Sequence, residues 1–303
     1  MSLTSDPKGG GPARRYFDRY LNGHRSIQRS WRSAIGDVVV SRRADCAPGD
    51  FGLAADHLLV GAAVNLLGWG TAGYDIALAV NPRVADQLRE IVESPLDDRD
   101  RAARASWYCG LLDSVGRGFR LTEDHPLAAY RDATSLESAF ERVPRGVVDE
   151  LIELLEANRE HICELPSPRL KGPHFASSGL VGGADCDLLV GTHIVELKTV
   201  SDRALDRDFL RQLVGYALLD TTDEFGITHV TLWFTRHAFS MTWNVEELLF
   251  ELSGGSTLTL TERREAFRDS LVNVEFGPVI TPSQRKRVAR GQQLALFELS
   301  ATR

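Results

Sequence analysis

The order of apolar patterns in this chain of 303 residues predicts a mixed protein of the α/β (α+β) class. Helical periodicity comes first, without a convincing strand, at 84–93, 102–117, 135–142 and 147–163. Runs rich in β-branched and aromatic residues, which favour strands, follow at 186–190, 192–200, 228–235 and 239–243. Helical patterns return at 206–220, 245–252 and 263–271. A helical region is therefore expected before a region in which strands and helices alternate.

The early helical stretches end where proline and glycine become frequent. Pro166, Pro168 and Pro173 break the pattern, because proline lacks the amide hydrogen that a helix interior needs. A glycine-rich turn at 182–183 then leads to the first strand-like run. The chain therefore changes its structural character near residue 165.

The helix expected at 206–220 follows a polar start at Ser201 and Asp202. Its apolar residues recur at helical spacing, at Phe209, Leu210, Leu213, Val214, Ala217 and Leu218. Gln212 and Tyr216 lie four residues apart, so they occupy one side of this helix.

Composition indicates an ordinary globular protein, with 43% hydrophobic and 25% charged residues and a net charge of −7. No run approaches a membrane span, and the N-terminus lacks the apolar core of a signal peptide. We therefore expect a cytoplasmic protein without membrane contact, in which residues 1–12 form a disordered tail. The cysteines are scattered and predict free thiols without zinc, at Cys46, Cys109, Cys163 and Cys186.

Residues 184–200 place acids inside two strand-like runs, where a core strand would not have them. The runs meet at a Gly-Thr pair, which predicts a β-hairpin. Because side chains alternate along a strand, Asp185 and Asp187 share one face of the first run. Glu196 and Lys198 share one face of the second. Neighbouring carboxylates are costly to bury without a cation, and oxygen ligands favour Mg²⁺ or Mn²⁺ over zinc.

The lysine of this hairpin is of a type that is rare in the chain. Of the 35 basic residues 31 are arginine, and the lysines are Lys8, Lys171, Lys198 and Lys286. A compact ammonium suits a water nucleophile or a developing phosphate charge better than a planar guanidinium does. The alternative is an edge strand on which Glu196 and Lys198 form an ordinary surface ion pair. Asp187, nine residues before Glu196 on the paired strand, favours the metal site.

Asp187, Glu196 and Lys198 make this segment similar to the core of the PD-(D/E)XK nuclease superfamily. The motif of that superfamily is an Asp, a hairpin connection, and then Asp or Glu, one residue and Lys. The resemblance implies a restriction-endonuclease-like core, in which helices flank a central mixed β-sheet. It also implies a basic helical segment with the first core helix, an α-helical insertion and a nuclease core, at 13–60, 61–164 and 165–303.

The RecB-like branch of this superfamily has a Gln-x-x-x-Tyr helix after the catalytic strand, which Gln212 and Tyr216 match. In that branch these residues are expected to orient the scissile strand or the lysine. The branch also has Gly, three residues and then a His on an early helix. Counting from Gly52 places Asp56 at that position, with His57 one residue later. Either residue is a candidate to complete the site, since Asp also ligates Mg²⁺.

The resemblance implies that Asp187, Glu196 and the carbonyl of Leu197 bind the metal, with Asp185 as the second choice for the first ligand. Further ligand candidates lie on the preceding helix, at Glu153, Glu156 and Glu160. Some members of the branch hold an iron-sulfur cluster with three cysteines near the C-terminus. This chain has no cysteine after Cys186, so no cluster is expected.

Residues 1–45 hold nine Lys or Arg against four Asp, with Tyr16, Tyr20 and Trp31 interleaved. Arginine for phosphates and aromatic rings for stacking are typical of a nucleic-acid groove. The alternative is a solvated basic face or an oligomer contact. Candidate nucleic-acid contacts are Arg15, Arg19, Arg25, Arg29 and Lys171, and a second basic cluster lies at 285–290.

These observations predict a Mg²⁺-dependent deoxyribonuclease, a phosphodiesterase whose partner is DNA. Two alternatives remain: an inactive nuclease-fold protein that acts as a nucleic-acid-binding or scaffolding module, and an RNA-directed nuclease. A helicase, an ATPase or another protein of the same operon is a further expected partner. Phage defence or DNA repair is the setting that the resemblance implies. The preference for Arg over Lys indicates a GC-rich bacterial genome.

Overall fold

The computed structural model describes residues 11–64, 77–78, 80–92, 98–116, 121–167 and 169–272. Within these residues eleven α-helices and one five-stranded mixed sheet form a mixed α/β protein that is mostly helical, as the sequence predicts. None of the helices in this part of the chain has both the length and the hydropathy to cross a bilayer. Positions 1–10 of the expected tail and the basic cluster at 285–290 lie outside the described residues.

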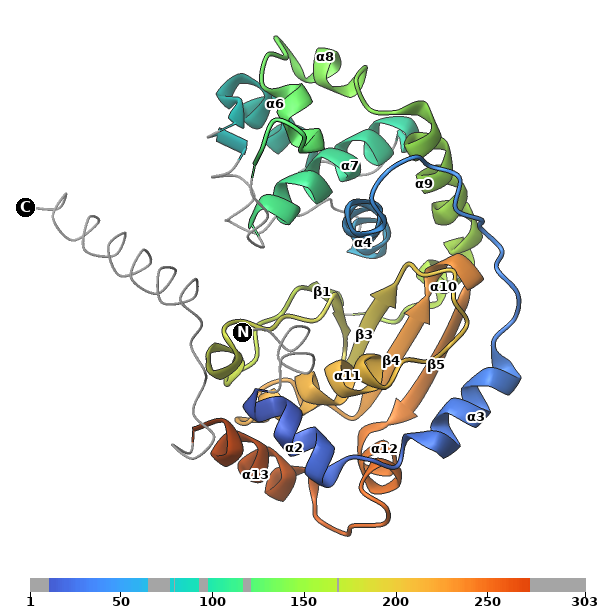
Figure 1. The fold of residues 1–303 in the computed structure, drawn as a ribbon, viewed down its shortest axis with the longest axis vertical. Coiled ribbons are helices and arrows are strands. Elements are labelled where there is room, and N and C mark those ends of the chain that lie inside the picture. The colour runs from blue at the N-terminus through green and yellow to red at the C-terminus, as the bar shows by residue number, and fades with distance from the viewer. Residues whose placement is uncertain are drawn as a thin grey trace, which may run out of the picture.

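The sheet has the order β1-β2-β3-β4-β5. Its strands are β1 (Arg169–Lys171), β2 (Leu188–Val190), β3 (His193–Lys198), β4 (His229–Phe234) and β5 (Phe239–Asn244). β3 and β4 pair in parallel, and the other neighbours pair antiparallel. Because a parallel pair needs a crossover connection, the chain returns from β3 to β4 through helix α11 (Arg207–Leu219), as Figure 1 shows.

The expected hairpin is present as β2 and β3. Its turn contains Gly191 at a φ of +58°, a conformation that glycine adopts without steric cost. Both strands are shorter than expected, since Asp187 leaves the ladder and uses its side chain as the acceptor instead. β1 is an additional strand that the sequence pattern does not predict, because it is short and two of its three residues are basic.

One face of the sheet carries a group of helices that we call the helical lobe, residues 48–164. Its helices are α4 (Pro48–Val64), α6 (Pro82–Val92), α7 (Arg99–Gly116), α8 (Leu136–Phe140), α9 (Arg145–Ala157) and α10 (Arg159–Glu164). They share a hydrophobic core with Val195, Leu197 and Trp233 of the sheet. α4 and α7 approach closely at Gly110, where a Cβ would lie 2.7 Å from the backbone nitrogen of Ala54.

The helix expected at 147–163 is divided into α9 and α10 at Asn158. This side chain donates to the carbonyl of Thr235 over 2.8 Å and accepts from the indole nitrogen of Trp233 over 2.8 Å. Asn158 is buried, so these partners satisfy polar groups that have no access to water. The break therefore fixes the helical lobe to the end of β4.

The opposite face of the sheet is covered by five helices. They are α2 (Pro12–Tyr20), α3 (His24–Ala34), α11, α12 (Val245–Leu252) and α13 (Leu260–Val272). The ring of Phe17 stacks on Phe267 at 5.5 Å, and Trp31 meets Phe234 edge-on at 4.6 Å. The N-terminal helices are therefore part of the sheet's core, and Pro12, at the end of the expected tail, begins α2 and is buried.

A buried ion pair also joins the helical lobe to the sheet. Glu150 of α9 and Arg236, which follows β4, meet at 2.5 Å. The second oxygen of Glu150 accepts from the backbone nitrogens of Arg43 and Ala44, both at 2.6 Å. Burial would raise the pKa of Glu150, but these hydrogen bonds and Arg236 hold it below its ordinary value. The pair is therefore ionised at neutral pH.

We predict that Glu150→Ala lowers the free energy of unfolding by about 3–5 kcal/mol, because it leaves the Arg236 guanidinium buried without its partner. Urea denaturation at pH 7 measures this change. In the unaltered protein the contribution should be present above the ordinary carboxyl pKa. It should decline as the pH falls through the lowered pKa of the folded state, because protonation removes the charge.

Glu153→Ala is the matched control. Glu153 lies on the same helix but pairs with Arg43 in an exposed position. Its removal should cost less than about 1 kcal/mol, since water screens the pair. Equal losses in the two variants would contradict the importance of the buried pair.

Candidate functional site

The strand register brings three chain segments to one end of the sheet: the end of β1, the start of β2 and the end of β3. Lys171 is the last residue of β1, and Asp187 directly precedes β2. Glu196 and Lys198 lie at the end of β3. The structure therefore places Asp187 beside the Glu-x-Lys segment, as the hairpin predicts.

Glu196 is the most enclosed residue of this group, with 3% of its surface exposed. Its Oε1 accepts hydrogen bonds from Lys198 Nζ at 2.8 Å and from Gln212 Nε2 at 2.7 Å. Its Oε2 is buried and has no hydrogen-bond partner among the described residues. A buried acceptor without a donor costs about 1–3 kcal/mol. This oxygen is thus an atom whose surroundings suit a cation.

Asp187 is half-buried and turns its side chain towards β3. Its Oδ2 accepts a hydrogen bond of 2.7 Å from the backbone nitrogen of Leu197. The N–H and C=O of one residue point to the same side of an extended strand, so the carbonyl of Leu197 also points towards this side. The ladder between β2 and β3 begins at Leu188 and Val195, so no β2 residue pairs with the carbonyl of Leu197. Two carboxylates and one backbone carbonyl therefore converge at the strand end.

The pKa values show that negative charge is in excess here. Burial and the charge of Asp187 raise the pKa of Glu196 to about 7, although Lys198 opposes this. Burial would lower the pKa of Lys198, but Glu196 and Asp187 outweigh it and raise that pKa. Burial and the same two carboxylates raise the pKa of Tyr216 well above its ordinary value. An additional positive charge would relieve this excess.

Helix α11 supplies the polar residues that hold Glu196. The helix begins after Asp206, whose side chain accepts from the nitrogen of Asp208 over 2.9 Å and caps the first turn. One helical turn separates Gln212 and Tyr216, and Gln212 Nε2 donates to Tyr216 Oη over 2.7 Å. Both side chains are buried against the sheet. Gln212 therefore fixes the carboxylate of Glu196, and Tyr216 fixes the amide of Gln212.

Helix α4 brings the two candidates Asp56 and His57 to the same region, and they differ in their contacts. The charge of Asp56 raises the pKa of Lys198 and also that of Lys171, although burial leaves the latter lowered overall. His57 is buried and contacts Asp113 Oδ2 at 3.0 Å and Lys171 Nζ at 3.4 Å. Asp56 therefore acts on both lysines, and His57 faces Asp113 and Lys171.

The other acidic candidates lie elsewhere. Asp185 is exposed and belongs to a backbone bridge with His174, so the register selects Asp187 over Asp185 as the neighbour of Glu196. Glu153 and Glu156 form ion pairs with exposed arginines, and Glu160 is exposed on α10. Among the described residues, no three His, Cys, Asp or Glu side chains form a complete metal-binding group. The oxygen groups that converge at the strand end are the carboxylates of Asp187 and Glu196 and the carbonyl of Leu197.

The basic residues of the N-terminal helices differ in how exposed they are. Arg15 is partly buried on α2, where Arg19 is exposed beside the ring of Tyr20. Arg25 and Arg29 are exposed on α3. Of the three aromatics expected to stack on bases, Tyr16 and Trp31 are instead core residues, because each lies on the apolar side of its helix. Tyr20 is exposed.

Arg25, Arg29 and Arg32 form a stripe on α3, since they recur at intervals of four and three residues. The buried residues Ile27 and Trp31 lie on the opposite side of the helix. No hydrogen bond or ion pair of the three arginine side chains occurs within the described residues, and α3 contains no acidic residue. We call this surface the α3 arginine stripe.

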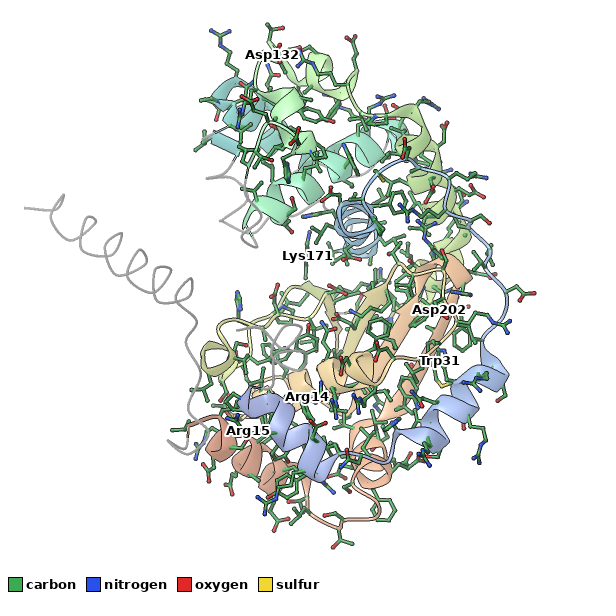
Figure 2. The ribbon with its side chains drawn as sticks, viewed as in Figure 1. Arg14, Arg15, Trp31, Asp132, Lys171 and Asp202 are labelled. Carbon is green, nitrogen blue, oxygen red and sulfur yellow. The ribbon has the colours of Figure 1, made fainter. Side chains whose placement is uncertain are left out.

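The sequence predicts Lys171 as a nucleic-acid contact but does not indicate the half-buried position that it has. It lies in the layer between the helical lobe and the sheet, as Figure 2 shows. The rarity of lysine, which singled out Lys198, applied equally to Lys171. The ring centre of Phe209 lies 5.3 Å from Lys198 Nζ. Nothing in the sequence indicates that Phe209 or Asp113 lies at the site.

The arrangement can bind a divalent cation and orient an ammonium group next to it. Its buried donors and acceptors are held by hydrogen bonds from α11 and from the β3 backbone. Charges that are fixed in this way and partly shielded from water act more strongly on a bound ion than freely solvated charges do. No protein-family model, curated protein or solved structure matches this chain.

Proposed function

We propose that this protein is a Mg²⁺- or Mn²⁺-dependent nuclease that hydrolyses DNA phosphodiester bonds, with a restriction-endonuclease-like core of the RecB-like kind. The observation that carries the proposal is the buried Oε2 of Glu196, which has no donor in the described part of the chain and belongs to a carboxylate on which the charges of Asp187 and Lys198 act. The five-stranded mixed sheet with helices on both faces supports the fold assignment.

The donor set fits a hard divalent cation. Asp187, Glu196 and the Leu197 carbonyl would hold it through oxygen atoms, and Mg²⁺ commonly takes one or two carboxylates with water and substrate phosphate. The acids whose charges act on Lys171 and Lys198 are Asp56, Asp113, Asp187 and Glu196. More carboxylates than ammonium groups therefore act on one another here, and a bound divalent cation would offset part of the negative charge.

When bound, the metal supplies Lewis-acid stabilisation of the phosphate oxygens and lowers the pKa of a water molecule. Lys198 orients the attacking water and offsets charge on the phosphate, with its ammonium held by Glu196 and lying near the Phe209 ring. Gln212 keeps the Glu196 carboxylate in one orientation, and Tyr216 keeps Gln212 in place. The shielding of this network from solvent strengthens each electrostatic contact.

The α3 arginine stripe supports nucleic acid as the substrate. α3 packs on the segment that follows the proposed catalytic strand: Trp31 Nε1 donates to the Arg203 carbonyl over 2.9 Å, and Gln28 to that of Leu205 over 2.8 Å. A row of exposed arginines free of acidic neighbours on its helix suits the phosphates of a strand. These two hydrogen bonds attach the helix of the stripe to the segment that follows β3.

We predict that Mg²⁺ or Mn²⁺ raises the melting temperature of the protein, and that Glu196→Gln lowers metal affinity by at least about tenfold. Isothermal titration calorimetry and thermal unfolding measure the two effects. Asp185→Asn is the matched control, because this exposed carboxylate lies close by in sequence and should leave the affinity nearly unchanged. Loss of affinity in the control alone would move the first ligand to Asp185.

The activity itself is tested by incubating the protein with linear, circular and single-stranded DNA, in Mg²⁺, Mn²⁺ or EDTA. We expect metal-dependent cleavage, and a rate about 10²–10³-fold lower for Glu196→Gln and for Lys198→Met. Glu164→Gln, an exposed change on α10, should keep the full rate. Cleavage that persists in both site variants would refute the site assignment.

RNA in the same assay tests the substrate class, because cleavage of RNA alone would identify an RNA-directed nuclease. DNA binding without cleavage under every condition would instead favour an inactive nuclease-fold module.

We predict that the double change Arg25→Ala with Arg29→Ala weakens DNA binding and makes it less dependent on salt. Each lost phosphate contact should reduce the slope of log affinity against log salt by about one unit. Fluorescence anisotropy at several salt concentrations measures the slope. Arg83→Ala with Arg131→Ala removes the same charge from exposed positions of the helical lobe and should leave the slope unchanged. Equal effects of the two pairs would contradict a local binding surface.

A further inference from the structure

Three side chains from three elements form a continuous chain of contacts that ends at the proposed site. Asp113 of α7 contacts His57 Nε2 of α4 at 3.0 Å. His57 Nδ1 lies 3.4 Å from the Nζ of Lys171, the last residue of β1. His57 is 6% exposed, so the chain runs through the layer between the helical lobe and the sheet. The helical lobe thus reaches the strand end through these contacts.

The donors and acceptors of the chain are mutually consistent. The ammonium of Lys171 has only hydrogens to offer, so Nδ1 of His57 must be the acceptor. In a neutral imidazole Nε2 then carries the proton and donates to the carboxylate of Asp113. Asp113 thereby selects the tautomer that presents an acceptor to Lys171, in the way that outer carboxylates orient histidines at metal sites.

The sheet order places the proposed metal ligand between two lysines. Lys171 ends β1, Lys198 ends β3, and Asp187 immediately precedes β2, the strand between them. The charges of Asp56 and Asp187 act on both lysines. Lys171 and Lys198 therefore lie on the two strands that adjoin β2, and the charge of Asp187 acts on both.

The choice of lysine is itself informative. Buried or partly buried cations elsewhere in the fold are arginines, as in the ion pairs of Arg211, Arg236 and Arg264. Lys171 and Lys198 are the only lysines in the described part of the chain, and both lie here. If these two residues were structural counter-ions only, arginine would serve, since it supplies 31 of the 35 basic residues of the chain. A compact ammonium suits close contact with a phosphate oxygen next to a metal.

We propose that Lys171 is a second lysine of the active site, held by His57 and Asp113 so that its ammonium contacts a non-bridging oxygen of the scissile phosphate. Lys171 is then a catalytic residue, and His57 and Asp113 are positioning residues that act through it. This inference rests on the proposed nuclease function. It also makes the helical lobe a part of the active site, because α4 and α7 supply the two positioning residues.

The test compares Lys171→Met, Lys171→Arg and Asp113→Asn with the unaltered protein, using linear DNA at saturating Mg²⁺. Lys171→Met should lower kcat by about 10²-fold, as removal of one transition-state donor does, with a much smaller change in KM. Lys171→Arg should recover part of the loss, since it restores the charge without the compact geometry. Asp113→Asn, which disturbs orientation only, should lower kcat by about tenfold.

Arg83→Met, an exposed change on α6, controls for the loss of one positive charge and should leave kcat unchanged. Melting temperature and calorimetric metal affinity are measured for every variant. If Lys171 only stabilises the fold, Lys171→Met lowers the melting temperature or the metal affinity but keeps the full kcat at saturating metal, and the proposal is overturned. If Lys171→Met fails to fold, an unchanged kcat in Asp113→Asn overturns the proposal instead.

Failure of this inference is distinguishable from failure of the proposed function. If the unaltered protein cleaves DNA, Glu196→Gln lowers the rate by about 10²–10³-fold as expected and Lys171→Met retains kcat, then only the role of Lys171 is wrong. If the unaltered protein cleaves neither DNA nor RNA, both proposals fall.

Discussion

The burial of one carboxylate, that of Glu196, is the constraint to which the rest of the site responds. Its Oε1 is stabilised by Lys198 and Gln212, and its Oε2 has no donor within the residues that the structure describes. A charge in this position requires α11 to lie against β3, because Gln212 reaches it only from there. Asp187 adds a second negative charge from the start of β2 and raises the pKa of Glu196 further. The region is therefore organised around a negative surplus that a divalent cation would offset.

Buried polar contacts hold the two halves of the molecule in the relation that this site needs. Glu150 and Arg236 join the helical lobe to the end of β4, and Asn158 joins the same end to the break between α9 and α10. Both lie between layers that share a large apolar core, as do the contacts of His57 with Asp113 and Lys171. Apolar packing alone tolerates sliding more readily than hydrogen bonds do, so these contacts fix where α4 and α7 meet the strand ends.

Lysine and arginine have separate places in this fold. Arginine forms the buried structural pairs and the exposed stripe on α3, where a rigid fork or a persistent charge is useful. The lysines of the described residues are confined to the strand ends beside Asp187. This separation distinguishes cations that support the structure from cations suited to chemistry. The rarity of lysine in the whole chain thus singles out Lys171 and Lys198.

The sequence by itself determined the mixed α/β class, the β2–β3 hairpin, α11 and the meeting of Asp187 with Glu196 and Lys198, because periodicity and alternation are local properties. It did not reveal β1, the division at Asn158 or the burial of Tyr16 and Trp31. The approach of Asp113 and His57 to Lys171 also depended on the tertiary structure, since it joins residues 56 and 114 positions apart. Contacts between layers are set by the packing of whole helices against a sheet, which no short segment encodes.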